Sequence, residues 1–284
     1  LSLLTFSKTF DELRAIPGRT KCPNCNNLRR YYCYDCVVPI GHTPPSPGRL
    51  PARFHIVRRA YEKPSKSSVI PLKLMYPEDV YLYTFRQANR FDPNAREGTI
   101  SPEIELEDWS TAALLFPTSD SVDWEEAKAR DSTEHIRDII VIDSTWSTAM
   151  QVIKTHPKIS SIKLRLKIGS ESQTMFWRHQ NIDRSCLATC EAVYVFLREM
   201  SSENVFDDVL YYYVFVHNII SDFYRTTKKH RGHLPEYTIN SLSNIFGVHV
   251  DRFDKCSQRN YMRLLKRRNQ KCLNVWNKFA RIAI

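Results

Sequence analysis

The sequence predicts an α/β fold with a mainly parallel sheet, joined to an N-terminal zinc-binding unit and a basic helical C-terminal region. Three observations predict it. Short apolar segments alternate with segments of helical periodicity, four of the 8 cysteines are clustered near the N-terminus, and positive charge gathers in the last part of the chain. The 284 residues, 42% hydrophobic and 25% charged, are typical of a globular protein with an ample core.

These features divide the chain into three parts. We expect residues 1–52 to form a segment that carries the zinc unit, residues 53–224 the α/β domain, and residues 225–284 a basic helical extension. The proline-rich stretch Pro39–Pro51 cannot be helical throughout. It is therefore expected to be an extended connection between the first two parts.

The zinc unit is predicted from two C-x-x-C pairs, formed by Cys22, Cys25, Cys33 and Cys36. Two such pairs close together are typical of knuckles that hold one tetrahedral Zn²⁺ through four thiolates. Such a site leaves no coordination position open, so we expect the zinc to be structural. Reduced structural thiols or a redox pair are the alternatives. Free thiols and thiolate sites both favour a reducing compartment.

The elements of the α/β domain follow from periodicity and turn residues. Strands are predicted at Phe54–Val57, Val80–Thr84, Ala112–Phe116, Ile139–Ile142 and the alternating segment Ile162–Ile168. Helices are predicted at Trp124–Arg130, Ser147–Lys154, Ala188–Met200 and Asp207–Tyr224. The acidic segment Glu97–Asp108 is expected to be an irregular surface loop.

The net charge of +10 is concentrated at the C-terminus. Residues 221–284 hold 14 Lys and Arg against 4 Asp and Glu, whereas residues 1–220 hold 27 of each. The last predicted helix, Gln258–Ala280, is amphipathic and carries its cations on one side: Arg259, Arg263, Lys266, Arg267 and Lys271. This pattern favours binding of a polyanion such as RNA; a solvated face is the alternative.

Several function classes are excluded by what the sequence lacks. The 7 glycines are not spaced as a Rossmann fingerprint or a P-loop, so a Rossmann methyltransferase or an NTPase is not expected. No G-x-S-x-G or H-E-x-x-H motif occurs. No apolar run reaches the roughly 18 residues of a membrane helix, and Val209–Ile220 predicts a buried helix. We expect neither a signal peptide nor a membrane partner.

Three segments remain as candidates for chemistry. Leu114-Leu115-Phe116-Pro117-Thr118 is a strand that ends in a turn, and Asp143-Ser144-Thr145-Trp146 follows another strand. Functional residues of parallel sheets gather at such carboxyl ends. The third segment runs from Phe176-Trp177-Arg178-His179-Gln180 to the helix start at Leu187–Ala192.

Simpler interpretations stay open for single residues. Asp143 or Ser144 could only cap the helix that follows. Trp146, taken alone, is more often a core residue than a ligand contact. Glu191 could serve only the start of its own helix.

Together these segments resemble the DTW-domain family of tRNA-uridine aminocarboxypropyltransferases. The resemblance rests on Asp-x-Thr-Trp at 143–146, Leu114–Pro117 before it and Leu187–Ala192 after it. The cysteine segment at 31–40, the stretch at 66–85 and Phe176–Gln180 are similar to the animal branch with one DTW domain. The resemblance covers about Lys21 to Met200 and combines several motifs in order.

The resemblance implies a SPOUT-like fold in which a C-terminal trefoil knot surrounds S-adenosylmethionine. It also implies transfer of the 3-amino-3-carboxypropyl group of this cofactor to N3 of a uridine in the tRNA D-loop, with release of methylthioadenosine. Residues 53–224 would then be the catalytic DTW domain. Residues 225–284 would bind tRNA.

On this reading the cofactor pocket is formed by the residues of the three motifs: Leu114, Leu115, Phe116, Pro117, Thr118, Asp143, Ser144, Thr145, Trp146, Leu187, Ala188 and Thr189. Asp143 is the candidate general base for the N3 proton, because a carboxylate at a strand end can be desolvated and made more basic. Arg178 and His179 are expected to hold the cofactor carboxylate or a tRNA phosphate. The cations of Gln258–Ala280 would bind further phosphates.

One position departs from the family pattern. The family usually has Leu-Ser-Thr before the glutamate, whereas this chain has Leu187-Ala188-Thr189, so a hydroxyl at position 188 is missing. Competing interpretations are a non-catalytic zinc-containing RNA-binding protein, a SPOUT-type RNA methyltransferase, and a related transferase acting on ribosomal RNA. We expect a monomer or homodimer in an intracellular location, the nucleus ahead of the cytosol because of the basic run Lys266-Arg267-Arg268.

Overall fold

The computed structural model describes residues 4–60, 63–86, 99–144, 146–169, 174, 187–201 and 206–227. Residues 5–171 and 188–216 form one compact unit, which contains the sheet. A second unit comprises residues 1–4, 172–187 and 217–284, most of which fall outside the described residues.

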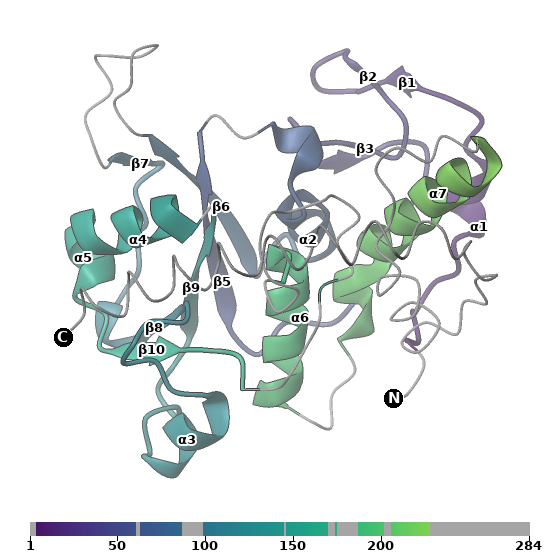
Figure 1. The fold of residues 1–284 in the computed structure, drawn as a ribbon. Helices are drawn as coiled ribbons and strands as arrows, with labels where there is room; N and C mark the ends of the chain where they lie inside the picture. Colours follow the sequence, from purple (N-terminus) through teal and green to yellow (C-terminus); the bar gives the residue numbers. More distant parts are fainter. Residues whose placement is uncertain are drawn as a thin grey trace, which may run out of the picture. The chain divides into compact units, whose positions relative to one another are not determined.

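A six-stranded sheet forms the centre of the first unit (Figure 1), with the order β10-β8-β9-β5-β6-β7. Its strands are β5 (Arg53–Arg59), β6 (Val80–Arg86), β7 (Thr99–Ser101), β8 (Ala112–Leu115), β9 (Asp138–Asp143) and β10 (Leu164–Leu166). All neighbouring strands are parallel except β6 and β7, which pair antiparallel. The carboxyl ends of the five parallel strands therefore share one edge of the sheet.

Helices and short hairpins complete the described elements. The helices are α1 (Asp11–Ala15), α2 (Val69–Met75), α3 (Trp124–Ala129), α4 (Trp146–Thr155), α5 (Pro157–Ser160), α6 (Thr189–Met200) and α7 (Tyr211–Thr227). Single 3-10 turns are η1 (Pro64–Lys66), η2 (Trp109–Thr111) and η3 (Asp207–Leu210). The remaining strands are β1 (Thr20–Lys21), β2 (Leu28–Arg29), β3 (Tyr32–Cys33) and β4 (Val38–Pro39).

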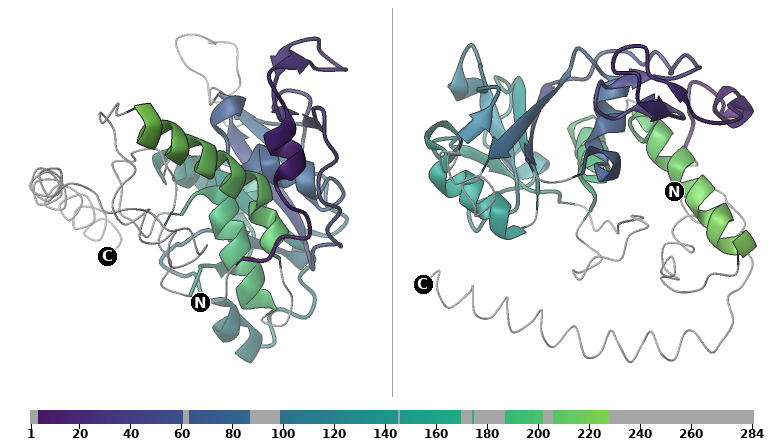
Figure 2. Two further views of the ribbon diagram at one scale, coloured as in Figure 1. Left: turned by 90° about the vertical axis from the view of Figure 1, so that its right-hand side faces the viewer. Right: turned by 90° about the horizontal axis from the view of Figure 1, so that it is seen from above.

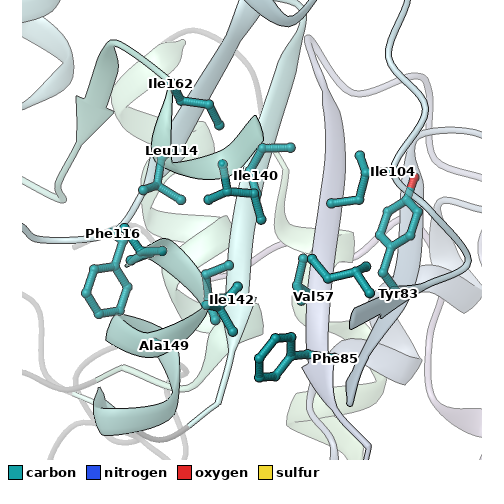
Figure 3. Packing of buried hydrophobic residues seen from close by; sticks show 14 of the residues in the cluster. Val57, Tyr83, Phe85, Ile104, Leu114, Phe116, Ile140, Ile142, Ala149 and Ile162 are labelled. Carbon is teal, nitrogen blue, oxygen red and sulfur yellow. The ribbon is translucent and has the colours of Figure 1, made fainter. Parts of the chain in front are cut away.

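One face of the sheet packs against α4 and α5. Alternation along β9 directs Ile140 and Ile142 to this face, where they join Ala149 of α4 in one buried cluster (Figure 3). Leu114 and Phe116 lie in the same cluster. Residues that point to either face of the sheet are buried along β8 and β9. These strands therefore appear as continuous apolar runs in the sequence.

The opposite face is covered by α2 and α6, as Figures 1 and 2 show. Both α4 and α6 contact β9, so the strand is buried on both sides. Since residues alternate, Asp143 points to the same side as Ile139 and Val141, toward α6. This alternation decides which helices can supply partners to Asp143.

The N-terminal cysteine unit consists of the hairpins β1–β2 and β3–β4. It packs on the start of α7 through Tyr212, whose hydroxyl lies 2.6 Å from His42 Nε2 and whose ring contacts Tyr32 edge-on. Upstream of the unit, Thr5 donates its backbone N–H to Asp207 over 2.6 Å. The beginning of the chain is thus fastened to η3 and α7 by polar and aromatic contacts.

The structure confirms the mixed α/β class, the mostly parallel sheet and a cluster of four cysteines. Each strand predicted in the α/β domain overlaps an observed strand, although β10 covers only the middle of Ile162–Ile168. The prediction of an irregular surface loop at Glu97–Asp108 is wrong in its middle, because Thr99–Ser101 forms β7 and Ile104 is fully buried. The charged neighbours of Ile104 hid one core position.

Helix α2 was not predicted, although six of its residues are buried. Its third residue is Pro71, which lowers helical propensity in an interior but is tolerated in the first turn, where no partner for its N–H is needed. The described residues do not test the expected C-terminal trefoil knot, and the predicted helix Gln258–Ala280 lies outside them. No helix of the described residues is long and apolar enough to cross a membrane.

Candidate active site

Asp143 is the centre of a polar cluster at the carboxyl edge of the sheet. It is the last residue of β9, and both of its carboxylate oxygens accept a side-chain hydrogen bond. Thr189, the first residue of α6, donates to Oδ1 over 2.6 Å, and Ser67, just before α2, donates to Oδ2 over 3.2 Å. Two helix starts and one strand end therefore converge on a single carboxylate.

Burial makes this carboxylate more basic than an ordinary aspartate. The side chain is 14% exposed, and desolvation raises the pKa of Asp143 above its usual value. The hydrogen bonds from Thr189 and Ser67 and the charge of Arg58 act in the opposite direction but only in part. A carboxylate with a raised pKa, held at a strand end, is suited to accept a proton.

Arg58 is a member of the cluster that the sequence did not single out. It lies on β5 directly beside Asp143, because the two residues are register partners in neighbouring parallel strands. Its Nε is 3.9 Å from Asp143 Oδ2, beyond hydrogen-bonding distance. A cation in a row of buried strand residues is the signal that could have revealed it.

Ser67 and Ser68 were also missed as site residues, although they lie within the stretch at 66–85. Ser68 Oγ accepts the backbone N–H of Cys190 over 3.4 Å, while Ser67 binds Asp143. The pair thus connects α2 to the first turn of α6 and to β9. Two adjacent serines before an apolar helix are the available signal, but their partners are remote in sequence.

The first turn of α6 is fixed by Glu191, which is 4% exposed. One oxygen of its carboxylate accepts the backbone N–H of Ala188 over 2.7 Å, and the other accepts the hydroxyl of Tyr213 over 3.0 Å. Glu191 therefore serves the start of its own helix, as one interpretation of the sequence held. By holding this turn, it also holds Thr189 against Asp143.

The interpretation of Asp143 or Ser144 as a helix cap stays a prediction, because Thr145, which directly precedes α4, lies outside the described residues. Among the described residues, Asp143 accepts hydrogen bonds from the side chains of Thr189 and Ser67. The hydroxyl of Ser144 is buried and, within the described part of the chain, has no hydrogen-bond partner.

The other predicted pocket residues occupy the same edge or fall outside the description. Leu115 ends β8, next to β9, and Pro117 and Thr118 follow it. Leu114 and Phe116 are packed in the core, so their side chains are already occupied. Trp146 begins α4, but its side chain is not described; Thr145, Arg178, His179 and the cations between Arg259 and Lys271 lie outside the described residues. Leu187 is half-buried.

The four cysteines form a geometry that suits a tetrahedral metal ion. The Sγ atoms of Cys22, Cys25, Cys33 and Cys36 all lie within 4.8 Å of one another, and those of Cys25 and Cys33 are 3.7 Å apart. Four thiolates at about 2.3 Å from a central zinc are separated by about 3.8 Å. The residue after each second cysteine has a left-handed backbone, with φ of 59° at Asn26 and 53° at Val37, so the two knuckles repeat one turn.

A second buried acid lies at the opposite, amino edge of the sheet. Asp138, the first residue of β9, accepts a two-pronged contact from Arg53 at 2.7 and 2.9 Å and lies 2.8 Å from His55 Nε2. The other ring nitrogen of His55 lies 2.9 Å from the Tyr83 hydroxyl. Every member of this network has its partners, which indicates a structural role.

Comparison with known proteins agrees with the motifs at the carboxyl edge. The profile of the DTW domain matches residues 19–221. Similar curated proteins are each named tRNA-uridine aminocarboxypropyltransferase 1. That of Xenopus laevis is 26% identical over 250 residues, covering 76% of this chain and 85% of the relative. The human protein is 26% identical over 256 residues, covering 72% and 78%.

No solved structure matches the chain. The profile match, however, covers well over half of the sequence and contains the whole Asp143 cluster. The resemblance seen in the sequence is thereby confirmed: the chain belongs to the DTW domain family.

Proposed function

We propose that the protein is a tRNA-uridine aminocarboxypropyltransferase that uses Asp143 as its general base. The observation that carries the proposal is the buried Asp143, with its raised pKa, at the strand end where the family motif lies. The names of its relatives supply the reaction class. The acceptor is a uridine N3, in a tRNA D-loop as the family resemblance implies.

The residues at this edge fit S-adenosylmethionine as the donor. The amino-acid end of that molecule carries both a carboxylate and an ammonium group, and the site offers both a guanidinium and a carboxylate. The buried hydroxyl of Ser144 has no partner in the described residues, which supports a bound polar group nearby. When bound, S-adenosylmethionine supplies an electrophilic carbon activated by its positively charged sulfur.

The chain's own contribution is to prepare the uridine. At neutral pH the N3 of uridine carries a proton, which must leave before the nitrogen can bond to carbon. Asp143 takes this proton as the N3–C bond forms and the C–S bond breaks, and the bonding electrons stay on sulfur, as methylthioadenosine leaves. Thr189 and Ser67 keep the accepting carboxylate in one orientation throughout.

The remaining parts of the chain are proposed to bind and support. A knot of the SPOUT type would close around the donor, and the parallel strand order supports that proposal. The cysteine unit would hold a structural zinc, and the cations of residues 225–284 would bind tRNA phosphates, so that tRNA affinity falls steeply with salt. The basic run at Lys266–Arg268 supports residence in the nucleus.

The test is mass spectrometry of tRNA nucleosides after incubation of unmodified tRNA with the protein and S-adenosylmethionine. We expect aminocarboxypropyluridine and methylthioadenosine, and a loss of about 100-fold to 10,000-fold in rate for Asp143→Asn. Asp120→Asn, at an exposed aspartate, is the matched control. Full activity of Asp143→Asn would remove Asp143 as the base.

The products separate the competing functions. Adenosylhomocysteine with a methylated nucleoside would identify a methyltransferase. Failure to bind S-adenosylmethionine in calorimetry, with RNA binding retained, would identify a non-catalytic RNA-binding protein.

A further inference from the structure

Arg58 faces the same space as Asp143. Its neighbour Val57 lies in the cluster on the α4 side of the sheet, so alternation directs Arg58 to the side of α2 and α6. Its register partner Asp143 points to that side as well. Both side chains thus extend from the carboxyl edge toward the first turn of α6.

The Nε atom of Arg58 is buried and has no hydrogen-bond partner among the described residues. The side chain is 13% exposed. Its ion pair with Asp143 is long, at 3.9 Å, and the described residues offer it no other. Asp143 meanwhile takes its hydrogen bonds from Thr189 and Ser67. A buried donor left unsatisfied is costly, so such a donor indicates a missing ligand.

The same sheet contains a closed arginine–aspartate pair for comparison. At the amino edge, Arg53 donates two hydrogen bonds of 2.7 and 2.9 Å to Asp138, so the two charges satisfy each other. At the carboxyl edge, Arg58 and Asp143 are also register partners but remain apart. The difference between these two pairs indicates that Arg58, unlike Arg53, can bind a ligand.

A carboxylate is the ligand that fits this arginine. A guanidinium presents a planar fork of donors that matches the two oxygens of a carboxylate. An RNA backbone phosphate is a poorer candidate, because Arg58 projects from a central strand and is largely buried. A small ligand with a terminal carboxylate can reach it.

We infer that Arg58 binds the α-carboxylate of the donor, on the aminocarboxypropyl group that is transferred. The inference rests on the proposed function, which supplies the donor. It assigns the carboxylate to Arg58 and leaves Arg178 and His179 for tRNA phosphates. By binding the aminocarboxypropyl group itself, Arg58 would position the reacting carbon of that group relative to Asp143.

The experiment compares two probes that differ in one group. S-Adenosylmethionine has the carboxylate, and decarboxylated S-adenosylmethionine lacks it. Calorimetry of both with the full chain should show that Arg58→Gln weakens binding of S-adenosylmethionine about 10-fold to 100-fold. Binding of the decarboxylated probe should be unchanged or tighter, because one positive charge has been removed near its ammonium group.

Two further variants keep the result interpretable. Arg58→Lys retains a cation beside Asp143, so it should fold even if Arg58→Gln does not, and it should show a smaller loss for the carboxylated probe alone. Arg59→Gln, at the exposed neighbouring residue, should leave both affinities unchanged.

Three outcomes would overturn the inference: equal weakening of both probes by the Arg58 variants, no weakening of either, or a carboxylate-specific loss in Arg178→Gln in place of the Arg58 variants. If the unaltered chain binds neither probe, the proposed function itself fails. Binding by the unaltered chain without discrimination by Arg58 removes only the inference.

Discussion

The basicity of Asp143 is set by two opposing effects at the scale of single side chains. Burial disfavours the charged carboxylate and raises the pKa of Asp143, whereas the hydroxyls of Thr189 and Ser67 and the charge of Arg58 favour it. The shorter of the two hydrogen bonds, 2.6 Å, comes from Thr189. This hydroxyl is therefore the group through which a single substitution can change the basicity of the proposed base.

We expect Thr189→Val to move the acid limb of the pH profile of kcat/KM to higher pH. The hydrogen bond from Thr189 lowers the pKa of Asp143, so its removal raises that pKa further. Because the base must be deprotonated, activity should then fall more at pH 6 than at pH 8. Initial rates across this range measure the shift.

Thr189→Ser is the control, since it retains the hydroxyl in the first turn of α6. Its acid limb should coincide with that of the unaltered protein. A Thr189→Val profile reduced equally at every pH would show that Thr189 only supports the fold.

At the scale of elements, the start of α6 is half of a capping box. Glu191 accepts the N–H of the N-cap residue Ala188, and Ser68 accepts that of Cys190. Ala188 has an extended backbone, with φ of −65° and ψ of 152°, but no side-chain oxygen to accept the N–H of Glu191. The alanine that departs from the family pattern thus stands where a serine would cap the helix.

Ala188→Ser should therefore stabilise the domain by about 1 kcal/mol, the usual worth of a hydroxyl at the N-cap. Urea denaturation followed by circular dichroism would measure the free energy of unfolding. Ala188→Gly adds backbone freedom but no hydroxyl. If backbone freedom rather than the hydroxyl stabilises the helix start, the free energies of unfolding of Ala188→Gly and Ala188→Ser should differ by only a few tenths of a kcal/mol. Stability unchanged by serine would show that the backbone N–H groups are already satisfied.

At the scale of the whole molecule, the two edges of the sheet have different tasks. At the amino edge, Asp138 ties β5 to β9 through Arg53 and His55. At the carboxyl edge, Asp143 gathers two helix starts but leaves Arg58 and Ser144 without hydrogen-bond partners for their buried atoms among the described residues. The buried acid at the amino edge has its partners and stabilises the fold, whereas the carboxyl edge holds buried polar atoms without partners in the described part of the chain.

The contacts of Asp138 at the amino edge of the sheet predict that the stability of the fold depends on pH. Burial alone would raise the pKa of Asp138, but the hydrogen bonds from His55 and Arg53 lower it below the ordinary 3.8. A lowered pKa in the folded state means that the stabilisation is complete above pH 3.8 and is lost as the pH falls through the folded value.

Asp138→Asn should accordingly destabilise the protein by roughly 3 kcal/mol at pH 7. This value is at the lower end of the range for breaking a buried ion pair, because the Arg53 side chain is 35% exposed. The difference from the unaltered protein should shrink as the pH falls below 3.8. Thermal unfolding at several pH values measures it, with the exposed Asp120→Asn as control. A difference that is constant down to pH 2 would contradict the charged role of Asp138.

Part of the candidate site could be predicted and part could not. Asp143 and Thr189 were predicted because each belongs to a motif written on contiguous residues. Ser67 and Arg58 were not, because a serine 76 residues before Asp143 carries no local sign of its partner, and a cation in a strand does not by itself show which residue of the neighbouring strand lies beside it. Pro71 similarly hid α2, and the charged neighbours of Ile104 hid its place in the core.

The sequence by itself determined most strands and helices of the α/β domain, the clustering of four cysteines and the family of the motifs, because periodicity and spacing are local properties. Only the tertiary structure decided that Asp143 binds Thr189 and Ser67 and lies beside Arg58. The physical reason is that parallel strands align residues distant in the chain, and alternation then directs Asp143 and Arg58 to one face. Burial on that face, which no sequence pattern shows, gives Asp143 its raised pKa and leaves the Nε atom of Arg58 without a hydrogen bond among the described residues.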